Sequence, residues 1–152
     1  MKKLLFAVLL LAVAAGTGYL MHEGVVPGWQ SDRALIKSKS LRFLECLKFK
    51  AFEEAAAFHA PADRQARPDL PKLLEDFFKI PPENLDIQDL NVDFIEFDST
   101  GQRAKAKTTC GVRILNTKEE KRPEAVLYWK KADGTWYLDL RTTLERGSSA
   151  GF

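Results

Sequence analysis

The first pattern along the chain is an almost uninterrupted apolar run, Leu4 to Met21, directly after Lys2 and Lys3. A hydrocarbon core takes about 20 apolar residues to cross, so the run predicts a single membrane-spanning helix. A cleaved secretory signal is the alternative, because the small residues at positions 12–15 supply a cleavage site. Residues 1–21 are therefore interpreted as a membrane anchor or a signal peptide.

Both interpretations predict the same location for the rest of the chain. The lysines stay on the cytoplasmic side of the membrane. An anchored chain would be single-pass in an inner membrane with its domain on the periplasmic, extracytoplasmic side, and a cleaved chain would be released to the periplasm. The membrane is the one partner that the sequence indicates directly, through residues 4–21.

After a linker at residues 22–30, rich in Gly and Pro, the spacing of apolar residues predicts two helices. The first is long, with Ser31-Asp32 as its N-cap, and it ends near Pro61. The second is shorter, begins at Asp69 and is stopped by Pro81-Pro82. The predicted core residues are Leu41, Leu44, Leu47, Ala51, Phe52, Ala55 and Phe58 in the first helix, and Leu70, Leu73, Leu74, Phe77 and Phe78 in the second.

From Ile87 to Leu144 the apolar residues alternate with a period of two, which is typical of half-buried strands. Three turn signals interrupt the alternation, at residues 98–101, 116–123 and 133–134. A three-residue loop ending at Gly101 and a two-residue Asp133-Gly134 loop define two antiparallel hairpins. The predicted pairs are Phe94 with Ala106, Val92 with Thr108, Leu90 with Cys110, Asp93 with Lys107, Trp129 with Leu138, Leu127 with Leu140, and Tyr128 with Asp139.

This pattern predicts an α+β fold: an N-terminal apolar helix, then a long and a shorter helix packed on one face of a four-stranded antiparallel sheet. The predicted domain covers residues 31–145, and residues 146–152 are a tail. About 130 residues form one domain that needs no disulfide or metal to bury its core.

The last hairpin, Tyr128 to Leu138 (YWKKADGTWYL), follows two helices and a meander. This arrangement resembles the nuclear transport factor 2-like superfamily over roughly Lys39 to Leu144. In that superfamily a curved sheet wraps the long first helix into a cone, and a final hairpin of the form aromatic, Lys, Asp-Gly, aromatic is frequent. Members include isomerases, dehydratases, cyclases and binding modules without activity, so the resemblance implies a fold and leaves the function open.

The predicted register defines which strand residues would line the interior of such a cone. Isomerase-like members place carboxylates and a Tyr there, because proton abstraction next to a carbonyl needs a base and an oxyanion donor. In this chain Glu96 is the one carboxylate at a predicted inward strand position, and no His or second acid accompanies it. The chain therefore departs from the enzyme pattern, and its candidate ligand pocket is Glu96, Thr108, Cys110 and Trp129.

The remaining candidate residues have simple structural interpretations. His59 lies at a helix end, where its charge favours the dipole, and His22 lies in the linker. Two His and two Cys, widely separated, match no metal site, and no cofactor is implied. Cys46 and Cys110 could form a disulfide in an oxidising compartment, whereas the helical wheel, which points Cys46 away from the core, favours two free thiols.

Charge excludes one class of partner. Lys2 and Lys3 account for the net charge of +2, so the rest of the chain carries 21 basic and 21 acidic residues. Nucleic-acid binders usually have a clustered basic excess, so we expect no nucleic acid. A basic stripe of Arg103, Lys105, Lys107 and Arg113 is expected to be neutralised across strands by Asp89 and Asp93.

Phe43 and Phe49 flank the predicted core stripe of the first helix and are expected to form a partner surface or dimer surface. The sequence thus favours a non-catalytic envelope accessory domain, tethered to the membrane and acting through protein contact or self-association. The alternatives are a small-molecule-binding module that uses the cone cavity and, with less support, an isomerase- or dehydratase-like enzyme.

Overall fold

A computed structural model describes residues 31–76 and 81–147. The apolar run, the linker at residues 22–30, Phe77 and Phe78 lie outside the described residues, so the predictions made for them stay predictions. The chain divides into two units after Leu35. Apart from the first turn of the first helix, which belongs to the first unit, the architecture below is that of the second unit. Within the described ranges no helix is long and apolar enough to cross a membrane.

α2 (Asp32–Lys48) begins where the sequence predicts. Ser31 is its cap, because the Ser31 Oγ accepts a hydrogen bond from the amide of Ala34 at 3.2 Å. This bond satisfies one of the free amides in the first turn of the helix.

The first helix is shorter than predicted and ends at Lys48, because Lys50 adopts the left-handed conformation with φ of 60°. The Lys50 amide donates to the Leu47 carbonyl at 3.1 Å, and the Ala51 amide donates to the Cys46 carbonyl at 2.8 Å. These two bonds form a Schellman C-cap, a position that glycine usually occupies. A lysine at this position gave no sequence signal for the helix end.

The buried face of α2 is rotated from the predicted one. Phe43 is buried, whereas Leu41 and Leu47 are only half-buried. The Phe43 ring packs edge-on against Phe58 and His59, with ring centroids 5.8 and 6.4 Å apart. Because a phenyl ring buries more apolar area than a leucine side chain, it favours this orientation of the helix. The buried residues of α2 are Ile36, Ser40, Phe43, Leu44 and Cys46.

Three short helices follow: α3 (Phe52–Ala56), α4 (Pro61–Ala66) and α5 (Leu70–Asp76). Pro61 does not end a long helix but begins α4, where its missing amide removes no hydrogen bond. α5 corresponds to the second predicted helix. Its buried residues are Leu70 and Leu74.

The sheet follows a 3-10 turn, η1 (Pro82–Asn84), and all its strand pairs are antiparallel. β1 (Leu85–Phe97) pairs with β2 (Arg103–Ile114), β2 pairs with β4 (Glu124–Ala132), and β4 pairs with β5 (Thr135–Leu138). The predicted order of the four main strands is confirmed.

A fifth strand, β3 (Glu119–Lys121), occupies a segment for which the sequence predicted only a turn. It pairs with the end of β2, on the same side of β2 as β4. Pro123 separates β3 from β4 because proline has no amide for the ladder. β3 therefore continues the line of β4, and the sheet keeps four strand positions.

β1 differs from the predicted strand because it contains a bulge at Asp93. Val92 faces Thr108 as predicted, but the next pair joins Phe94 to Lys107, so Asp93 is an extra residue. An inserted residue reverses the alternation of side chains beyond it. The predicted pairs that this bulge contradicts are Phe94 with Ala106 and Asp93 with Lys107.

A second irregularity interrupts β1 at Asp89 and Leu90. Asp89 has a φ of 50°, in the left-handed region that non-glycine residues seldom adopt. The last regular pair before it joins Gln88 to Gly111. Leu90 has no partner in the ladder, so its predicted pairing with Cys110 is wrong.

The β4–β5 hairpin has the predicted register. Trp129 faces Leu138, and the Asp133–Gly134 loop has positive φ at both residues, 49° and 74°. Two left-handed residues make the tight turn that matches the twist of paired strands. The predicted pair of Leu127 with Leu140 does not form, because β5 ends at Leu138.

α6 (Leu140–Gly147) replaces the end of the predicted last strand. Asp139 is its cap: Oδ1 accepts from the Thr142 amide at 3.3 Å, and Oδ2 accepts from the Thr142 hydroxyl at 2.9 Å. Asp139 still meets Tyr128 as predicted, through its amide, which donates to the Tyr128 carbonyl at 2.7 Å. A capping carboxylate can begin a helix immediately after a strand.

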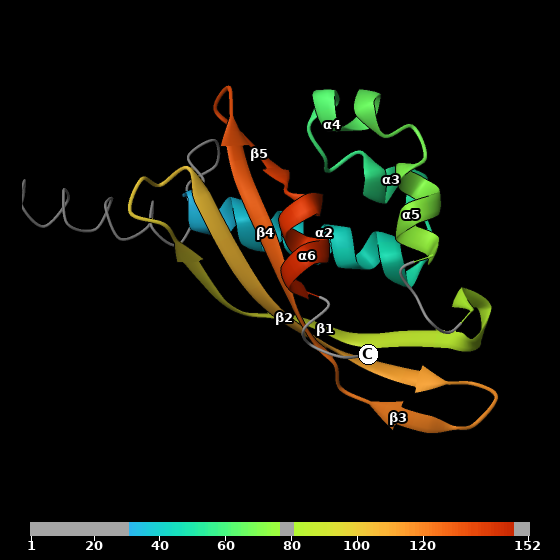
Figure 1. Cartoon of the computed structure of the whole chain (residues 1–152). Coiled ribbons are helices and arrows are strands. Elements are labelled where there is room, and N and C mark those ends of the chain that lie inside the picture. Colours follow the sequence, from blue (N-terminus) through green and yellow to red (C-terminus); the bar gives the residue numbers. More distant parts are fainter. Residues whose placement is uncertain (1–30, 77–80, 148–152) are drawn as a thin grey trace, which may run out of the picture. The chain divides into compact units, whose positions relative to one another are not determined.

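Within the second unit the sheet lies between helices (Figure 1). α2 covers the apolar face, where the Lys39 Nζ donates to the Trp136 carbonyl at 2.8 Å, and α6 lies against β4 on the opposite face. The predicted α+β class with a curled antiparallel sheet is confirmed. α6 on the opposite face is a helix that the sequence did not predict.

Candidate functional site

The apolar face of the sheet is filled by two indole rings. Trp129 of β4 is 1% exposed and Trp136 of β5 is 0% exposed. The Trp136 ring packs edge-on against Phe97 of β1, with ring centroids 5.8 Å apart. Trp129, which the sequence placed in a ligand pocket, is therefore a core residue.

Two other predicted pocket residues, Thr108 and Cys110, lie on β2. Thr108 is buried, and its hydroxyl donates to the Ala125 carbonyl of β4 at 3.1 Å, so the sheet satisfies its polar group. Cys110 is half-buried, and burial raises the pKa of its thiol. A raised pKa keeps the thiol protonated and unreactive at neutral pH.

Glu96, the fourth predicted pocket residue, points away from the apolar face. The bulge at Asp93 turns it outward, and its carboxylate lies 2.9 Å from the Lys105 Nζ. The four residues are therefore not brought together, because Thr108 and Trp129 are in the core and Glu96 is exposed.

Cys46 and Cys110 are both free thiols in the structure. Cys46 is buried in α2, and burial is the main cause that raises the pKa of its thiol; the nearby Arg42 lowers it by a smaller amount. Neither thiol has the depressed pKa that marks a nucleophile.

His59 is fully buried at the junction of the helices with the sheet. Its Nδ1 lies 3.0 Å from the Ala56 carbonyl and donates to it, and the neighbouring Phe58 carbonyl accepts a hydrogen bond from the Leu138 amide at 2.9 Å. Burial lowers the pKa of the imidazole from its ordinary value of 6.5. The ring is therefore neutral at pH 7 and joins the helices to β5. His22 lies outside the described residues.

In the part of the chain that the structure describes, four buried side-chain polar atoms have no hydrogen-bond partner: Ser40 Oγ, His59 Nε2, Trp129 Nε1 and Trp136 Nε1. An unpartnered buried polar group costs about 1–3 kcal/mol. The interior thus contains two indole donors, an imidazole acceptor and a hydroxyl with unused bonding capacity. Sequence reasoning missed this set because its members come from α2, the segment between α3 and α4, β4 and β5, with no common spacing. Within residues 31–76 and 81–147, no group of three or more His, Cys, Asp or Glu side chains could hold a metal ion.

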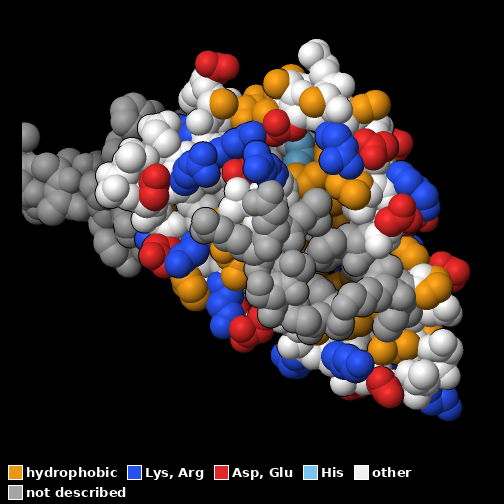
Figure 2. Space-filling view, viewed as in Figure 1, with side chains coloured by type: hydrophobic (Ala, Val, Ile, Leu, Met, Phe, Trp, Pro, Cys, Tyr) orange, Lys and Arg blue, Asp and Glu red, His pale blue; other side chains and the backbone are white. Residues whose placement is uncertain are grey.

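The basic stripe on β2 is ion-paired, but not by the acids that the sequence suggested. Within the described residues neither Asp89 nor Asp93 makes a salt bridge with it; the acids that do come from β1, β3, β4 and the cap of α6. The contacts are Arg103 with Asp139 at 3.8 Å, Lys105 with Glu96 at 2.9 Å, Lys107 with Glu124 at 2.7 Å, and Arg113 with Glu120 at 2.9 Å. The hydrogen bond to Glu124 is the main cause that raises the pKa of Lys107, and the charge of Asp93 contributes to it. Basic and acidic side chains are correspondingly interspersed on the face shown in Figure 2.

The expected surface of Phe43 and Phe49 does not form. Phe43 is buried, whereas Phe49 is 71% exposed beside the break between α2 and α3. A single exposed aromatic residue is normal on a soluble surface, so Phe49 alone does not define an interface.

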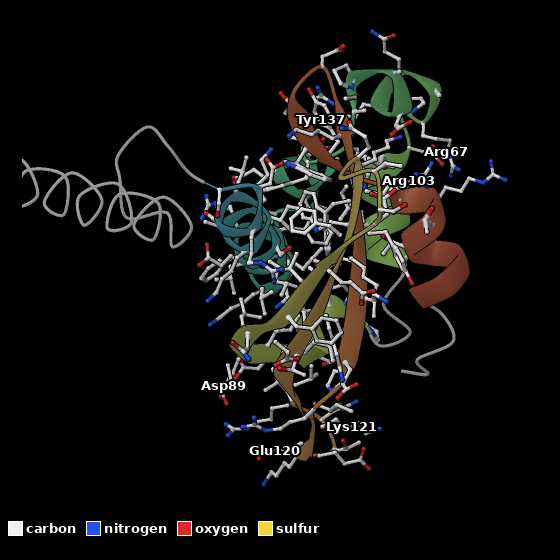
Figure 3. The ribbon with its side chains drawn as sticks, turned by 90° about the vertical axis from the view of Figure 1, so that its left-hand side faces the viewer. Arg67, Asp89, Arg103, Glu120, Lys121 and Tyr137 are labelled. Carbon is white, nitrogen blue, oxygen red and sulfur yellow. The ribbon has the colours of Figure 1, made fainter. Side chains whose placement is uncertain are left out.

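A polar groove lies at the end of the sheet farthest from the Asp133–Gly134 turn, with a cavity volume of about 320 Å³. The first bulge of β1 forms one wall, with Asp89, and the β2–β3 hairpin forms the other, with Glu120 and Lys121. Figure 3 shows these three side chains gathered at one end of the molecule, away from Tyr137. Sequence reasoning missed the groove because the bulge that shapes it has no sequence signal.

Comparisons with known proteins assign no function to these features. No known protein family matches the sequence. A comparison with curated proteins likewise finds no match.

Proposed function

We propose that this chain is a non-catalytic accessory domain of the bacterial envelope. It is tethered to the inner membrane through residues 4–21, with its domain on the periplasmic side, and acts through contact with another protein or with a second copy. The apolar run after two lysines supports the location. The balanced charge of the rest of the chain supports a protein partner over a nucleic acid.

One observation carries the choice of protein contact over a ligand cavity. Trp129 and Trp136, at 1% and 0% exposure, occupy the face of the sheet on which a cone-shaped relative would hold its ligand. Two grooves formed by described residues are open at the surface, and charged side chains are among the residues that line each of them. Recognition chemistry of this kind suits another macromolecule.

The curled antiparallel sheet with a helix on its apolar face supports membership of the nuclear transport factor 2-like superfamily. The Asp133–Gly134 hairpin, which has the predicted register, adds to that support. The break after Lys48 and the position of α6 depart from the expected pattern. An isomerase- or dehydratase-like activity has less support, because Glu96 is exposed and Asp139 caps α6.

The test begins with topology. A C-terminal reporter that is active only outside the cytoplasm should be active, and the intact mass of the chain purified from membranes should include residues 1–21. Amine-reactive cross-linking in native membranes should then give one discrete product larger than the monomer. A cytoplasmic reporter signal, or a chain that stays monomeric at every cross-linker concentration, would contradict the proposal.

A second candidate function, a small-molecule-binding module, is favoured by the four unpartnered buried atoms. A guest that reached these atoms would need an acceptor for the indole donors and a donor for the His59 Nε2. Mass spectrometry under non-denaturing conditions separates the candidates. A stoichiometric non-covalent adduct of the membrane-extracted chain would favour the small-molecule-binding module. The mass of the chain without an adduct would favour protein contact.

A further inference from the structure

We propose that the groove between the first bulge of β1 and the β2–β3 hairpin binds an extended, carboxylate-rich segment of a partner protein. The proposal rests on the proposed function and names the surface and the partner chemistry for it. Three properties of the groove carry the argument: its floor, its charged walls and its shape.

The floor of the groove contains Gly111, a glycine inside strand β2. Its φ is not in the left-handed region, and an added Cβ would lie 3.6 Å from the Asp89 Oδ2 and the Gln88 carbonyl, an ordinary contact distance. Neither the backbone nor the neighbours therefore require glycine here. A glycine inside a strand weakens it and often marks a place where another backbone approaches closely. The missing side chain keeps the floor of the groove accessible.

The walls supply three cations whose present partners hold them weakly. Arg122 contacts Asp89 at 3.2 Å across the groove, and these side chains are 77% and 65% exposed. Lys121 contacts Glu119 at 3.5 Å. Ion pairs this exposed contribute little to stability, so an incoming carboxylate can replace them.

Arg113, on β2, completes the cationic wall. Its Nε and Nη2 lie 3.0 and 2.9 Å from the same oxygen of Glu120. A guanidinium has five donors in a planar fork, which matches both oxygens of a carboxylate. An incoming carboxylate that engages both edges of this fork would bind better than the present one-oxygen contact.

Charge and shape select the partner class. Three cations and two acids, Asp89 and Glu120, line the groove, whereas Glu119, the partner of Lys121, lies outside the lining, so the groove itself favours an anion. Those acids, and the balanced charge of the domain, disfavour a polyanion such as nucleic acid. A volume of about 320 Å³ is at the small end for a ligand pocket, and the rim side chains are exposed. A segment that passes along the groove fits this shape better than an enclosed molecule.

The test measures binding of a fluorescent octapeptide of alternating Glu and Ser to the full chain in lipid nanodiscs of zwitterionic lipid, with a Lys-Ser octapeptide as the charge control. Gly111→Leu, which fills the floor, should weaken binding of the Glu-Ser peptide by about tenfold, and Arg122→Ala by about fivefold. Lys105→Ala should leave it unchanged, because Lys105 is an ion-paired cation on the same sheet but outside this groove. Thermal melting verifies that each variant folds, and Gly111→Val replaces Gly111→Leu if the latter melts early.

Equal binding by wild type and Gly111→Leu would overturn the proposal, as would preference for the Lys-Ser peptide or an equal loss in Lys105→Ala. If phosphatidylglycerol vesicles displace the fluorescent Glu-Ser peptide and unlabelled Glu-Ser peptide does not, the groove binds lipid headgroups. That result would also overturn the proposal. Cross-linking in native membranes distinguishes failure of the groove proposal from failure of the proposed function. A cross-linked product that persists in Gly111→Leu refutes the groove and preserves the proposed function, whereas its absence from the wild type refutes the proposed function.

Discussion

The β4–β5 hairpin and strand β1 lie in the same sheet but follow different rules. The hairpin is regular, turns tightly at Asp133–Gly134 and contributes two buried indole rings. β1 is the longer strand, yet it contains two irregularities and most of its side chains are partly or fully exposed. The sequence predicted the register of the hairpin and only part of the register of β1.

This difference shows that strand register is fixed where a slip would expose buried side chains. A slip of one residue in the hairpin would move Trp136 from the core to solvent, which carries a large free-energy penalty. At the outer side of β1 a slip changes little buried area, so an extra residue is tolerated there. Bulges of this kind are common at sheet edges, where they also discourage unwanted pairing.

Deleting one residue from each region gives the largest expected contrast. Deleting Lys130 should abolish folding, because it turns Trp136 and Leu138 away from the core. Deleting Asp93 should destabilise the chain by only about 1 kcal/mol or less, because removal of the bulge leaves Val92 and Ile95 on the buried face. Circular dichroism and urea unfolding measure both. A folded Lys130 deletion, or an unfolded Asp93 deletion, would contradict the comparison.

Truncating one large apolar side chain in each region gives the next largest effect. Trp136→Ala should lower the free energy of unfolding by about 3–5 kcal/mol, as for other buried aromatic residues. Phe94→Ala, at a side chain that is 48% exposed, should change it by about 0.5 kcal/mol or less. Similar losses in the two variants, measured by urea unfolding, would mean that the hairpin is not the packed part of the domain.

His59 gives the hairpin side a pH dependence. Burial lowers the pKa of His59 below 6.5, so below pH 6.5 the unfolded chain binds a proton that the folded chain does not. The contribution of His59 to stability is therefore fully present above pH 6.5 and declines as the pH falls from 6.5 toward the lowered folded-state pKa. The slope is at most about 1.4 kcal/mol per pH unit.

The matched variant for this pH effect is His59→Asn, whose amide can still donate to the Ala56 carbonyl. The difference in unfolding free energy between wild type and variant should shrink as the pH falls from 7.5 to 5.5. Asp63 and Lys130, which form an ion pair at 2.8 Å near His59, are unchanged in both proteins. A difference that is independent of pH would show that His59 is not buried in its neutral form.

Two glycines give the smallest and most specific contrast, because their substitutions should act in opposite directions. Gly134 has φ of 74°, so Gly134→Ala should destabilise the hairpin by about 1–2 kcal/mol. Gly111 has no such requirement and has room for a Cβ, so Gly111→Ala should stabilise β2 by about 0.5–1 kcal/mol. Thermal unfolding of both variants should show melting temperatures shifted to opposite sides of the wild type.

The parts of the fold that sequence reasoning predicted share a strong local signal. Ser31 as a cap, the Asp133–Gly134 turn and the pairing of Trp129 with Leu138 were read from residue type and alternation. The parts of the fold that sequence reasoning missed have no strong local signal. Lys50 holds a position usually taken by glycine. The bulge at Asp93 interrupts a segment whose apolar and polar residues alternate regularly in the sequence.

The candidate site was harder to predict than the fold because it depends on those missed features. The predicted pocket required Glu96 and Trp129 on one face, and the bulge at Asp93 separates them. The groove around Gly111 depends on the left-handed Asp89 and on β3, which the sequence interpreted as a turn. Asp139 had a usable sequence signal, because an acid three residues before Thr142 can cap a helix. The sequence interpretation placed Asp139 in a strand instead.

Hydrogen exchange tests the central claim most directly, that the domain makes its contact at the irregular end of the sheet while the interior stays closed. The full chain is compared in native membranes and in purified nanodiscs, with exchange followed by mass spectrometry of its peptides. The account predicts slower exchange in native membranes for residues 86–93 and 111–122, and equal exchange in both preparations for residues 127–138. Slower exchange confined to residues 127–138, or no difference anywhere, would contradict it.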